Sequence, residues 1–142
     1  MPLLNYTTKI SADKTVMDVQ RILAKTGARA ILANYDDTGT IVALSFQMMV
    51  NGELVAYKLP CNPAPVMLIL ERDPKVPRPL KTREQALRVA WRIVKDWTEA
   101  QLAIIETQMV KPEQVFLPYA VTGTGETIFE RYESGKLLGG GQ

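Results

Sequence analysis

Five basic side chains stand close together near the middle of the chain, where they could bind phosphate groups. They are Lys75, Arg78, Lys81, Arg83 and Arg88. They surround the predicted start of a helix, where unpaired backbone amides and the positive end of the helix dipole attract anions. Basic residues at a helix start oppose that dipole, so helix stability alone does not explain them. They form a candidate site for nucleic acid or another anion, and a solvated, proline-stiffened loop is the alternative interpretation.

The distribution of charge supports an anionic partner better than the total does. The 142 residues carry a net charge of only +2. Residues 72–95 contain eight basic and two acidic residues, a local charge of +6. The remainder contains nine basic and thirteen acidic residues, a charge of −4. This asymmetry predicts that the middle of the chain faces an anion.

The composition argues against most catalytic chemistry. The sequence has no histidine, the commonest general base, and its one cysteine is Cys61. A Ser-His-Asp or Cys-His site, an internal disulfide and a Cys/His zinc site are therefore excluded. We expect no enzyme activity, no metal and no cofactor. The adjacent Asp36 and Asp37 are typical of a turn, although a carboxylate enzyme that uses a metal is a third hypothesis.

Both tryptophans lie among basic residues, in a pattern that could stack bases and hold phosphates. At 100° per residue, Arg88, Arg92 and Lys95 fall on one helix face. Trp91 and Trp97 lie with the apolar residues, so we expect them in the core or in an interface.

Two ion pairs are expected along the charged face of this helix. Arg92 can pair with Asp96, and Lys95 with Glu99, because residues four apart are neighbours on a helix.

The segment Thr-Gly-Thr-Gly-Glu-Thr at residues 122–127 resembles a phosphate loop only in its glycines. It has no Walker lysine and no complete G-x-G-x-x-G after a strand. We interpret Gly123 and Gly125 as turn residues.

The elements that must position these residues predict an α+β fold. Residues 3–10 alternate as a strand does, and a short helix follows at 14–26, with Ser11 or Asp13 able to cap it and Gly27 able to end it. Three strands come next, at 28–35, 40–50 and 53–60. On the second strand, one face is expected to carry Val42, Leu44, Phe46, Met48 and Val50. Asn51-Gly52 predicts a hairpin, because both residues tolerate positive φ.

The second half predicts one long helix. Six of the nine prolines lie within residues 60–79 and flank an apolar run, Val66 to Leu70, whose periodicity fits a helix or a strand. Thr82 and Gln85 fit a capping box that starts a helix reaching about Met109. Residues 114–120 follow as a short strand or extended segment, and a last short helix begins at Thr127.

We therefore expect a single α+β domain over residues 1–142, with a flexible tail at 136–142. An antiparallel meander sheet of about four strands is covered by the long helix. The apolar side of that helix exceeds half its circumference, so either the C-terminal segment or a second subunit covers the rest, which favours a homo-oligomer. No segment predicts a signal peptide or a membrane span, so we expect a cytoplasmic protein with no membrane partner.

The order of helix, three antiparallel strands and a helix beginning KTREQALR resembles that of double-stranded-RNA-binding domains. That resemblance implies phosphate contacts from Lys81, Arg83 and Arg88 at the start of the second helix. The glycine-rich and lysine-rich signatures of the family are absent, and residues 61–81 intervene before the helix.

The phrases NYTTKI, LPCN, TREQALRVAWRIVKDWTEAQLAIIE and VFLPY together resemble a family of short uncharacterised proteins encoded by bacteriophages and prophage-like elements. The resemblance covers most of the chain. No activity is established for that family, so it transfers no catalytic residue. It implies a phage context in the host cytoplasm, where small non-enzymatic proteins bind nucleic acid or block host defence.

Two functions follow from these observations. The leading hypothesis is a non-enzymatic nucleic-acid-binding protein that contacts phosphates through the five basic residues. The second is an oligomeric anti-defence protein that holds a signalling nucleotide or a host immune protein. The latter would combine the same arginines with an aromatic residue such as Tyr57 or Tyr119.

Overall fold

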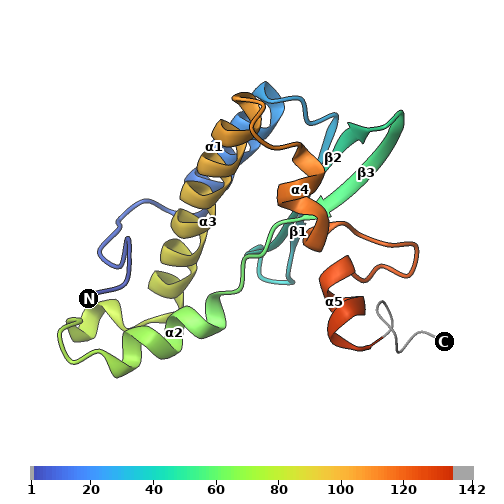
Figure 1. Ribbon diagram of the computed structural model, residues 1–142. Coiled ribbons are helices and arrows are strands. Elements are labelled where there is room, and N and C mark those ends of the chain that lie inside the picture. Colours follow the sequence, from blue (N-terminus) through green and yellow to red (C-terminus); the bar gives the residue numbers. More distant parts are fainter. Residues whose placement is uncertain (1, 136–142) are drawn as a thin grey trace. The chain divides into compact units, whose positions relative to one another are not determined.

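The computed structural model describes residues 2–135 (Figure 1), which group into two compact units. One unit comprises residues 2–22 and 60–100, and the other comprises residues 23–59 and 101–135. The chain passes between the units inside α1 (Ala12–Lys25), after Leu59, and inside α3 (Arg83–Glu106). The expected tail at 136–142 lies outside the described residues, and the expectation of a single domain stays a prediction.

Helix α1 begins two residues before its predicted start. The Ser11 hydroxyl accepts a hydrogen bond from the Lys14 amide at 3.1 Å, which makes Ser11 the cap rather than Asp13. Val16 and Val19 of this helix are buried. Gly27 follows the helix with φ +110°, which confirms its role in ending it.

In the first unit, α1 and α3 lie side by side (Figure 1) and are joined through Arg92. Arg92 Nη1 lies 3.7 Å from Asp18 Oδ2 and 3.4 Å from Thr15 Oγ1. The predicted pair of Arg92 with Asp96 is therefore wrong. Asp96 instead accepts a hydrogen bond from Asn5 Nδ2 at 2.9 Å. Each of the two residues therefore interacts with a residue of another segment instead of the one that lies one helical turn away.

Two carboxylates on these helices form ion pairs with nearby basic side chains. The pair of Lys95 with Glu99, 2.5 Å apart, is confirmed. On α1, a hydrogen bond from Lys14 holds the pKa of the Asp18 carboxyl below its usual value, and Lys95 and Arg92 act in the same direction.

Residues 3–10 do not form the predicted strand. Hydrogen-bonded turns cover this segment, and Asn5 adopts φ +65°. Two of its carbonyls, those of Tyr6 and Thr8, accept hydrogen bonds from Gln85 Nε2, both at 2.9 Å. An alternating pattern makes a strand only where a partner strand supplies the ladder, and here a buried glutamine supplies the donors instead.

The capping box at the start of α3 is only half formed. Thr82 Oγ1 accepts from the Gln85 amide at 3.1 Å, as predicted. The return bond is missing, because the Gln85 side chain is directed to the N-terminal segment. The helix itself spans 24 residues and ends three residues before the predicted Met109.

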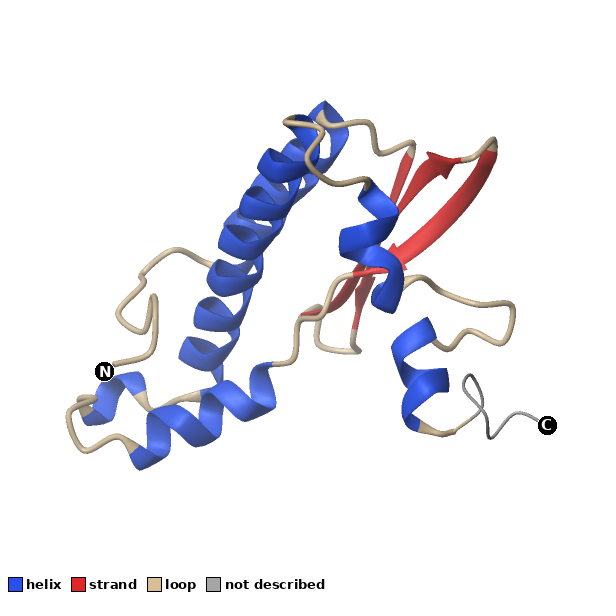
Figure 2. Ribbon diagram, viewed as in Figure 1, coloured by secondary structure: helices blue, strands red, loops and turns tan. Residues whose placement is uncertain are grey.

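The second unit contains the antiparallel meander that the sequence predicts. Strands β1 (Ala30–Tyr35), β2 (Ile41–Val50) and β3 (Glu53–Lys58) are hydrogen-bonded in the order β1-β2-β3 (Figure 2). The hairpin between β2 and β3 is confirmed, with φ +52° at Asn51 and +83° at Gly52.

A bulge changes which residues of β2 face the core. The register with β1 shifts at Asn34, so that Tyr35 pairs with Ile41 and leaves Val42 as the extra residue. Ile41 is 2% exposed and Val42 is 51% exposed, so the prediction that Val42 shares a face with Leu44 is wrong. Beyond the bulge, Leu44, Phe46 and Met48 are buried as predicted, and Val50 is half-buried.

Three aromatic rings join the sheet to the segment after α3. Phe46 on β2 and Tyr57 on β3 are cross-strand neighbours. Phe116 packs edge-to-face on Phe46, with ring centroids 5.3 Å apart, and lies 5.7 Å from Tyr57. Phe116 ends α4 (Pro112–Phe116), so the extended segment predicted at 114–120 is largely helical, continuing as η2 (Leu117–Tyr119). Whether the long helix covers the sheet stays a prediction.

Within the described residues the sheet has three strands instead of the predicted four or so, and an isolated bridge lies beside β3. Ala120 bridges Tyr57 on the outer side of β3, and the Val121 amide donates to the Ala56 carbonyl at 2.8 Å. Helix α5 (Ile128–Glu133) begins one residue after the predicted Thr127, which is its N-cap. Thr127 and Glu130 form a complete capping box, whose hydrogen bonds lower the pKa of the Glu130 carboxyl.

Candidate anion-binding site

The candidate site lies on the connection between α2 (Pro63–Arg72) and α3, in the first unit. The apolar run Val66 to Leu70, undecided from periodicity, is helical. Asn62 accepts from the Ala64 amide at 3.2 Å and caps the helix, and Pro63 occupies its first turn, where proline costs no hydrogen bond. Arg72 ends α2, and Asp73 returns to an extended conformation.

Two apolar side chains anchor this connection. Val76 is buried in a cluster with Leu70 of α2 and Ala86 of α3, and Leu80 packs against the same cluster. Tyr6 of the N-terminal segment also packs there. The connection is therefore fixed at two points against both helices instead of being a free loop.

Local hydrogen bonds and prolines stiffen the backbone between the anchors. Asp73 Oδ1 accepts from the Lys75 amide at 2.9 Å and forms a turn after α2. A short 3-10 helix, η1 (Arg78–Leu80), contains Pro79, and Pro74 and Pro77 precede it. Proline fixes φ, so the basic side chains are carried on a backbone with few alternative conformations.

Three of the five predicted residues are exposed cations without an acidic partner in the part of the chain that the structure describes. They are Lys75, Arg78 and Arg83. The other two are engaged. Lys81 Nζ donates to the Glu71 carbonyl at 3.3 Å, at the C-terminal end of α2. Arg88 pairs with Glu84 and donates to Gln85 Oε1 at 3.1 Å, which leaves it little capacity for a ligand.

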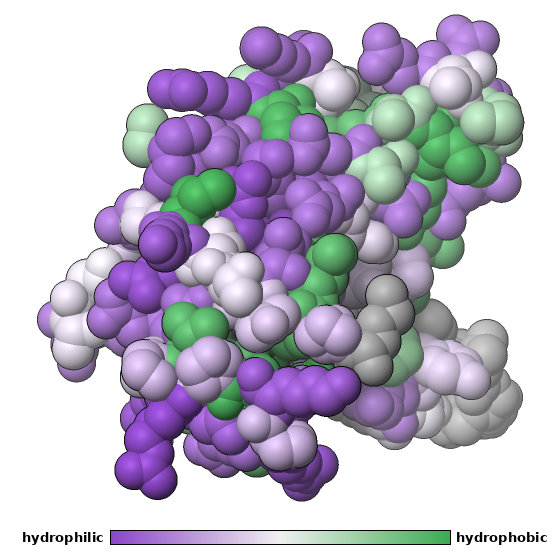
Figure 3. All heavy atoms as spheres, turned by 90° about the vertical axis from the view of Figure 1, so that its left-hand side faces the viewer, coloured by the Kyte–Doolittle hydropathy of each residue, from purple (hydrophilic) through white to green (hydrophobic). Residues whose placement is uncertain are grey.

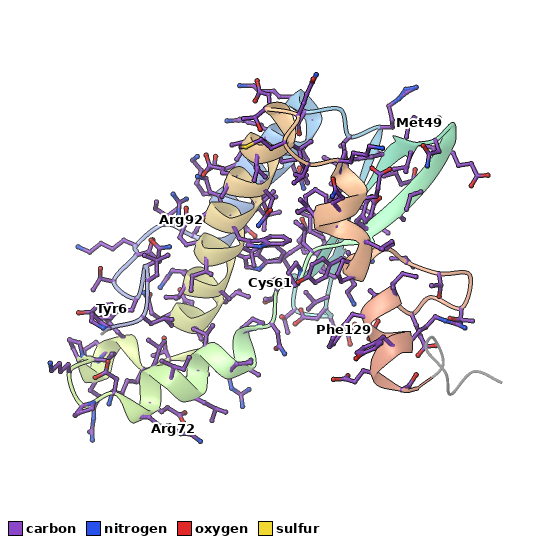
Figure 4. All side chains as sticks on the ribbon, viewed as in Figure 1. Tyr6, Met49, Cys61, Arg72, Arg92 and Phe129 are labelled. Atoms are coloured by element: carbon purple, nitrogen blue, oxygen red, sulfur yellow. The ribbon has the colours of Figure 1, made fainter. Side chains whose placement is uncertain are left out.

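Arg72 joins the exposed set, although the sequence pattern counted it only in the local charge. Its side chain points away from α2 (Figure 4) and is exposed. Residues 72–83 hold five basic residues and one acidic residue, Asp73. We call Arg72, Lys75, Arg78 and Arg83 the basic ridge. In Figure 3, strongly hydrophilic side chains project from the lower part of the surface, where α2 and the connection lie in Figure 1.

The tryptophans and Tyr57 do not supply a base-stacking surface. Trp91 and Tyr57 are each 1% exposed, and Trp97 is half-buried. A core position is thus confirmed for Trp91, as the helical phase predicted. Burial also raises the pKa of the Tyr57 hydroxyl, with a smaller contribution from Glu113.

The other motifs of the sequence have structural roles. The Asp36 carboxylate accepts hydrogen bonds from the Thr38 amide at 2.8 Å, the Thr38 hydroxyl at 2.6 Å and the Thr40 amide at 3.0 Å, which lower its pKa. It closes the turn before β2, as expected of a turn residue. Gly125 adopts φ +88° in a turn closed by Thr122 and Glu126. Within residues 2–135, no three His, Cys, Asp or Glu side chains are grouped to hold a metal.

Cys61 is predicted to be chemically inert. Burial raises the pKa of its thiol to about 12, from an ordinary value of 9.0. The thiolate is the reactive form, so alkylation of the folded protein at pH 8 should be at least about 100-fold slower than in urea. The folded rate should keep rising with pH beyond 9. The folded chain also keeps this proton where the unfolded chain releases it, so the free energy of unfolding should fall as the pH rises above 9. Equal rates in folded and unfolded protein would show that the thiol is accessible.

Comparison with known proteins finds no matching family model, no matching curated protein and no matching solved structure. Among the described helices, none combines the length and apolarity that crossing a bilayer requires. The site must therefore be interpreted from its own geometry.

Proposed function

We propose that the basic ridge binds the phosphate backbone of a nucleic acid, in a protein that is not an enzyme. The observation that carries this proposal is that the four residues of the basic ridge are exposed and lack acidic partners within residues 2–135. Further along α3, Arg88, Arg92 and Lys95 are each paired with a carboxylate. Unpaired like charges repel one another and add nothing to folding. An anionic ligand would explain why these charges are grouped on and beside one short connection.

The anchoring of the connection supports the same proposal. Val76 and Leu80 are held in the apolar cluster, and the prolines limit the backbone between them. A stiff carrier loses little conformational entropy when its side chains engage phosphates. Contacts with phosphates do not distinguish bases, so we expect binding that is independent of sequence and strongly dependent on salt.

The proposal differs from the sequence-based site in three residues. Arg88 is withdrawn from the direct contacts because Glu84 and Gln85 occupy its guanidinium. Lys81 is expected to contribute mainly by fixing the ridge to the end of α2. Arg72 takes a direct role.

Reversing two charges of the ridge should remove most of the binding. In the variant Lys75→Glu/Arg78→Glu, affinity for duplex DNA or RNA is expected to fall at least about tenfold. The slope of log K against log salt should decrease by about 1.8, which corresponds to two phosphate contacts. Both residues are exposed, so folding should be unaffected. Fluorescence anisotropy over a range of salt concentrations measures affinity and slope together.

A matched control separates the site from total charge. The variant Arg21→Glu/Lys111→Glu changes two other exposed residues and has the same net charge of −2. It should bind nearly as well as the native chain. An equal loss in both double variants would mean that only the net charge matters, and no loss in either would refute the site.

The same titration tests the alternative of an anti-defence protein that holds a signalling nucleotide. A small nucleotide offers few phosphates, so its binding would depend only weakly on salt. Tight, salt-insensitive binding of a dinucleotide, with no binding of duplexes, would replace the nucleic-acid proposal with this one.

A further inference from the structure

The sheet in the second unit has one edge strand that is hydrogen-bonded to a further segment and one that is not paired within the described residues. The outer edge of β3 is closed by the bridge at Ala120 and by the hydrogen bond from the Val121 amide to the Ala56 carbonyl. Beyond β1, no strand or bridge follows within the described residues. The backbone groups on that side of β1 form an open edge, to which another strand can be added.

The sequence of strand β1 lacks the residue types that usually protect an open edge. Its sequence, AILANY, contains no charged residue, no proline and no glycine. Leu32 is 60% exposed and Tyr35 is 55% exposed. Natural proteins protect such edges with lysine, proline or a covering segment, and an unprotected apolar edge is suited to pairing with another chain.

The surface beside this edge is also suited to a partner strand. A shallow depression of about 280 Å³ lies on the sheet, lined by residues of β1, β2 and β3 that include Ala30, Leu32, Gln47 and Ala56. None of its lining side chains is charged. An added strand would therefore extend an uncharged surface next to β1.

We infer that β1 pairs antiparallel with β1 of a second copy of this chain. The charges at the ends of the strand favour this partner. Arg29 precedes β1, and Asp36 and Asp37 follow it. Antiparallel self-pairing places the Arg29 end of each copy beside the acidic end of the other, twice in one symmetric interface.

The alternation of side chains fixes the register. Residues opposite each other in a sheet point to the same face. A two-fold axis perpendicular to the sheet must therefore pass beside a residue, not between two residues. An axis at Leu32 brings the most exposed large apolar side chain of the strand against its own copy and sets Arg29 opposite the partner's Tyr35. Pairing over six residues buries less than a standard interface, so we expect a weak dimer whose population rises with protein concentration.

Sedimentation equilibrium over a range of concentrations tests the inference. The native chain should pass from a 15.8 kDa monomer to a species of twice that mass. In Leu32→Lys, two lysines face each other across the axis, and the dissociation constant should rise at least tenfold. The control Leu54→Lys alters an equally exposed leucine of β3 and should dimerise normally, since Leu54 is 55% exposed. A native chain that stays monomeric, or a Leu32→Lys variant that dimerises normally, would overturn the inference.

Cross-linking tests the register independently. Directly opposed residues of antiparallel strands have Cα atoms about 4.5–5.5 Å apart, within the range for a disulfide. Mild oxidation should join two copies of Leu32→Cys, but not two copies of Leu54→Cys or of the native chain with Cys61 alone. Equal cross-linking of the two variants would indicate random collision and contradict the pairing.

Discussion

Replacing Trp91 by alanine is expected to lower the free energy of unfolding by about 4 kcal/mol. Trp91 is 1% exposed and is among the largest fully buried side chains of the described chain. Its removal deletes a large apolar surface and leaves a cavity that neighbours fill only in part. Because domains of this size are stable by about 5–15 kcal/mol, the variant should lose between about a quarter and four-fifths of the native stability. Urea unfolding followed by far-UV circular dichroism measures the change.

Replacing Trp91 by phenylalanine should change the free energy of unfolding by less than about 1 kcal/mol, because two effects oppose each other. The smaller ring loses apolar contact. It also removes the indole N–H, for which no acceptor is found within the described residues although the nitrogen is buried. A buried donor without a partner costs about 1–3 kcal/mol, so its removal offsets much of the lost contact. A loss in Trp91→Phe as large as that in Trp91→Ala would show that the nitrogen is hydrogen-bonded in solution.

Replacing Gln85 by leucine is expected to cost about 3 kcal/mol and to release the N-terminal segment. Gln85 is 2% exposed, and its Nε2 donates to the carbonyls of Tyr6 and Thr8. Leucine has a similar volume but no donor, so both half-buried carbonyls lose their partner. Arg88 Nη1 also loses an acceptor, Gln85 Oε1.

Two measurements distinguish this role from simple packing. Hydrogen exchange across residues 2–10 should accelerate, and trypsin should cleave after Lys9 faster than in the native chain. The control Gln101→Leu makes the same change at a half-buried position further along α3, and should leave the N-terminal segment protected. If both variants lose stability without faster cleavage at Lys9, the segment is not held by Gln85.

Features carried by a few neighbouring residues could be predicted from the sequence. Ser11 caps α1, Asn51 and Gly52 turn the hairpin, and Thr127 opens α5. In each case the donors, acceptors and backbone angles belong to residues within four positions of one another. Their geometry depends little on the rest of the chain, so the local pattern determines it.

The errors arose where a distant residue competed with a local one. Gln85 was expected to bond back to Thr82, but it donates to carbonyls 77 and 79 residues away. Arg92 was expected on Asp96 and lies on Asp18 instead. Val42 is exposed because a bulge in the pairing with β1 changes which residues at the start of β2 point to the buried side of the sheet. No local pattern encodes which of several acceptors, or which register, the packed chain selects.

The candidate site shows the same division. The sequence by itself determined that positive charge and proline concentrate between residues 72 and 95, because charge and backbone restriction belong to residue types. Only the tertiary structure decided which charges are available. In the folded chain, Arg88 donates hydrogen bonds to Glu84 and Gln85, and Lys81 donates to a carbonyl at the end of α2. Arg72 is exposed. The physical reason is that a cation is free for a ligand only if no acceptor of its own chain lies within reach, and that depends on packing.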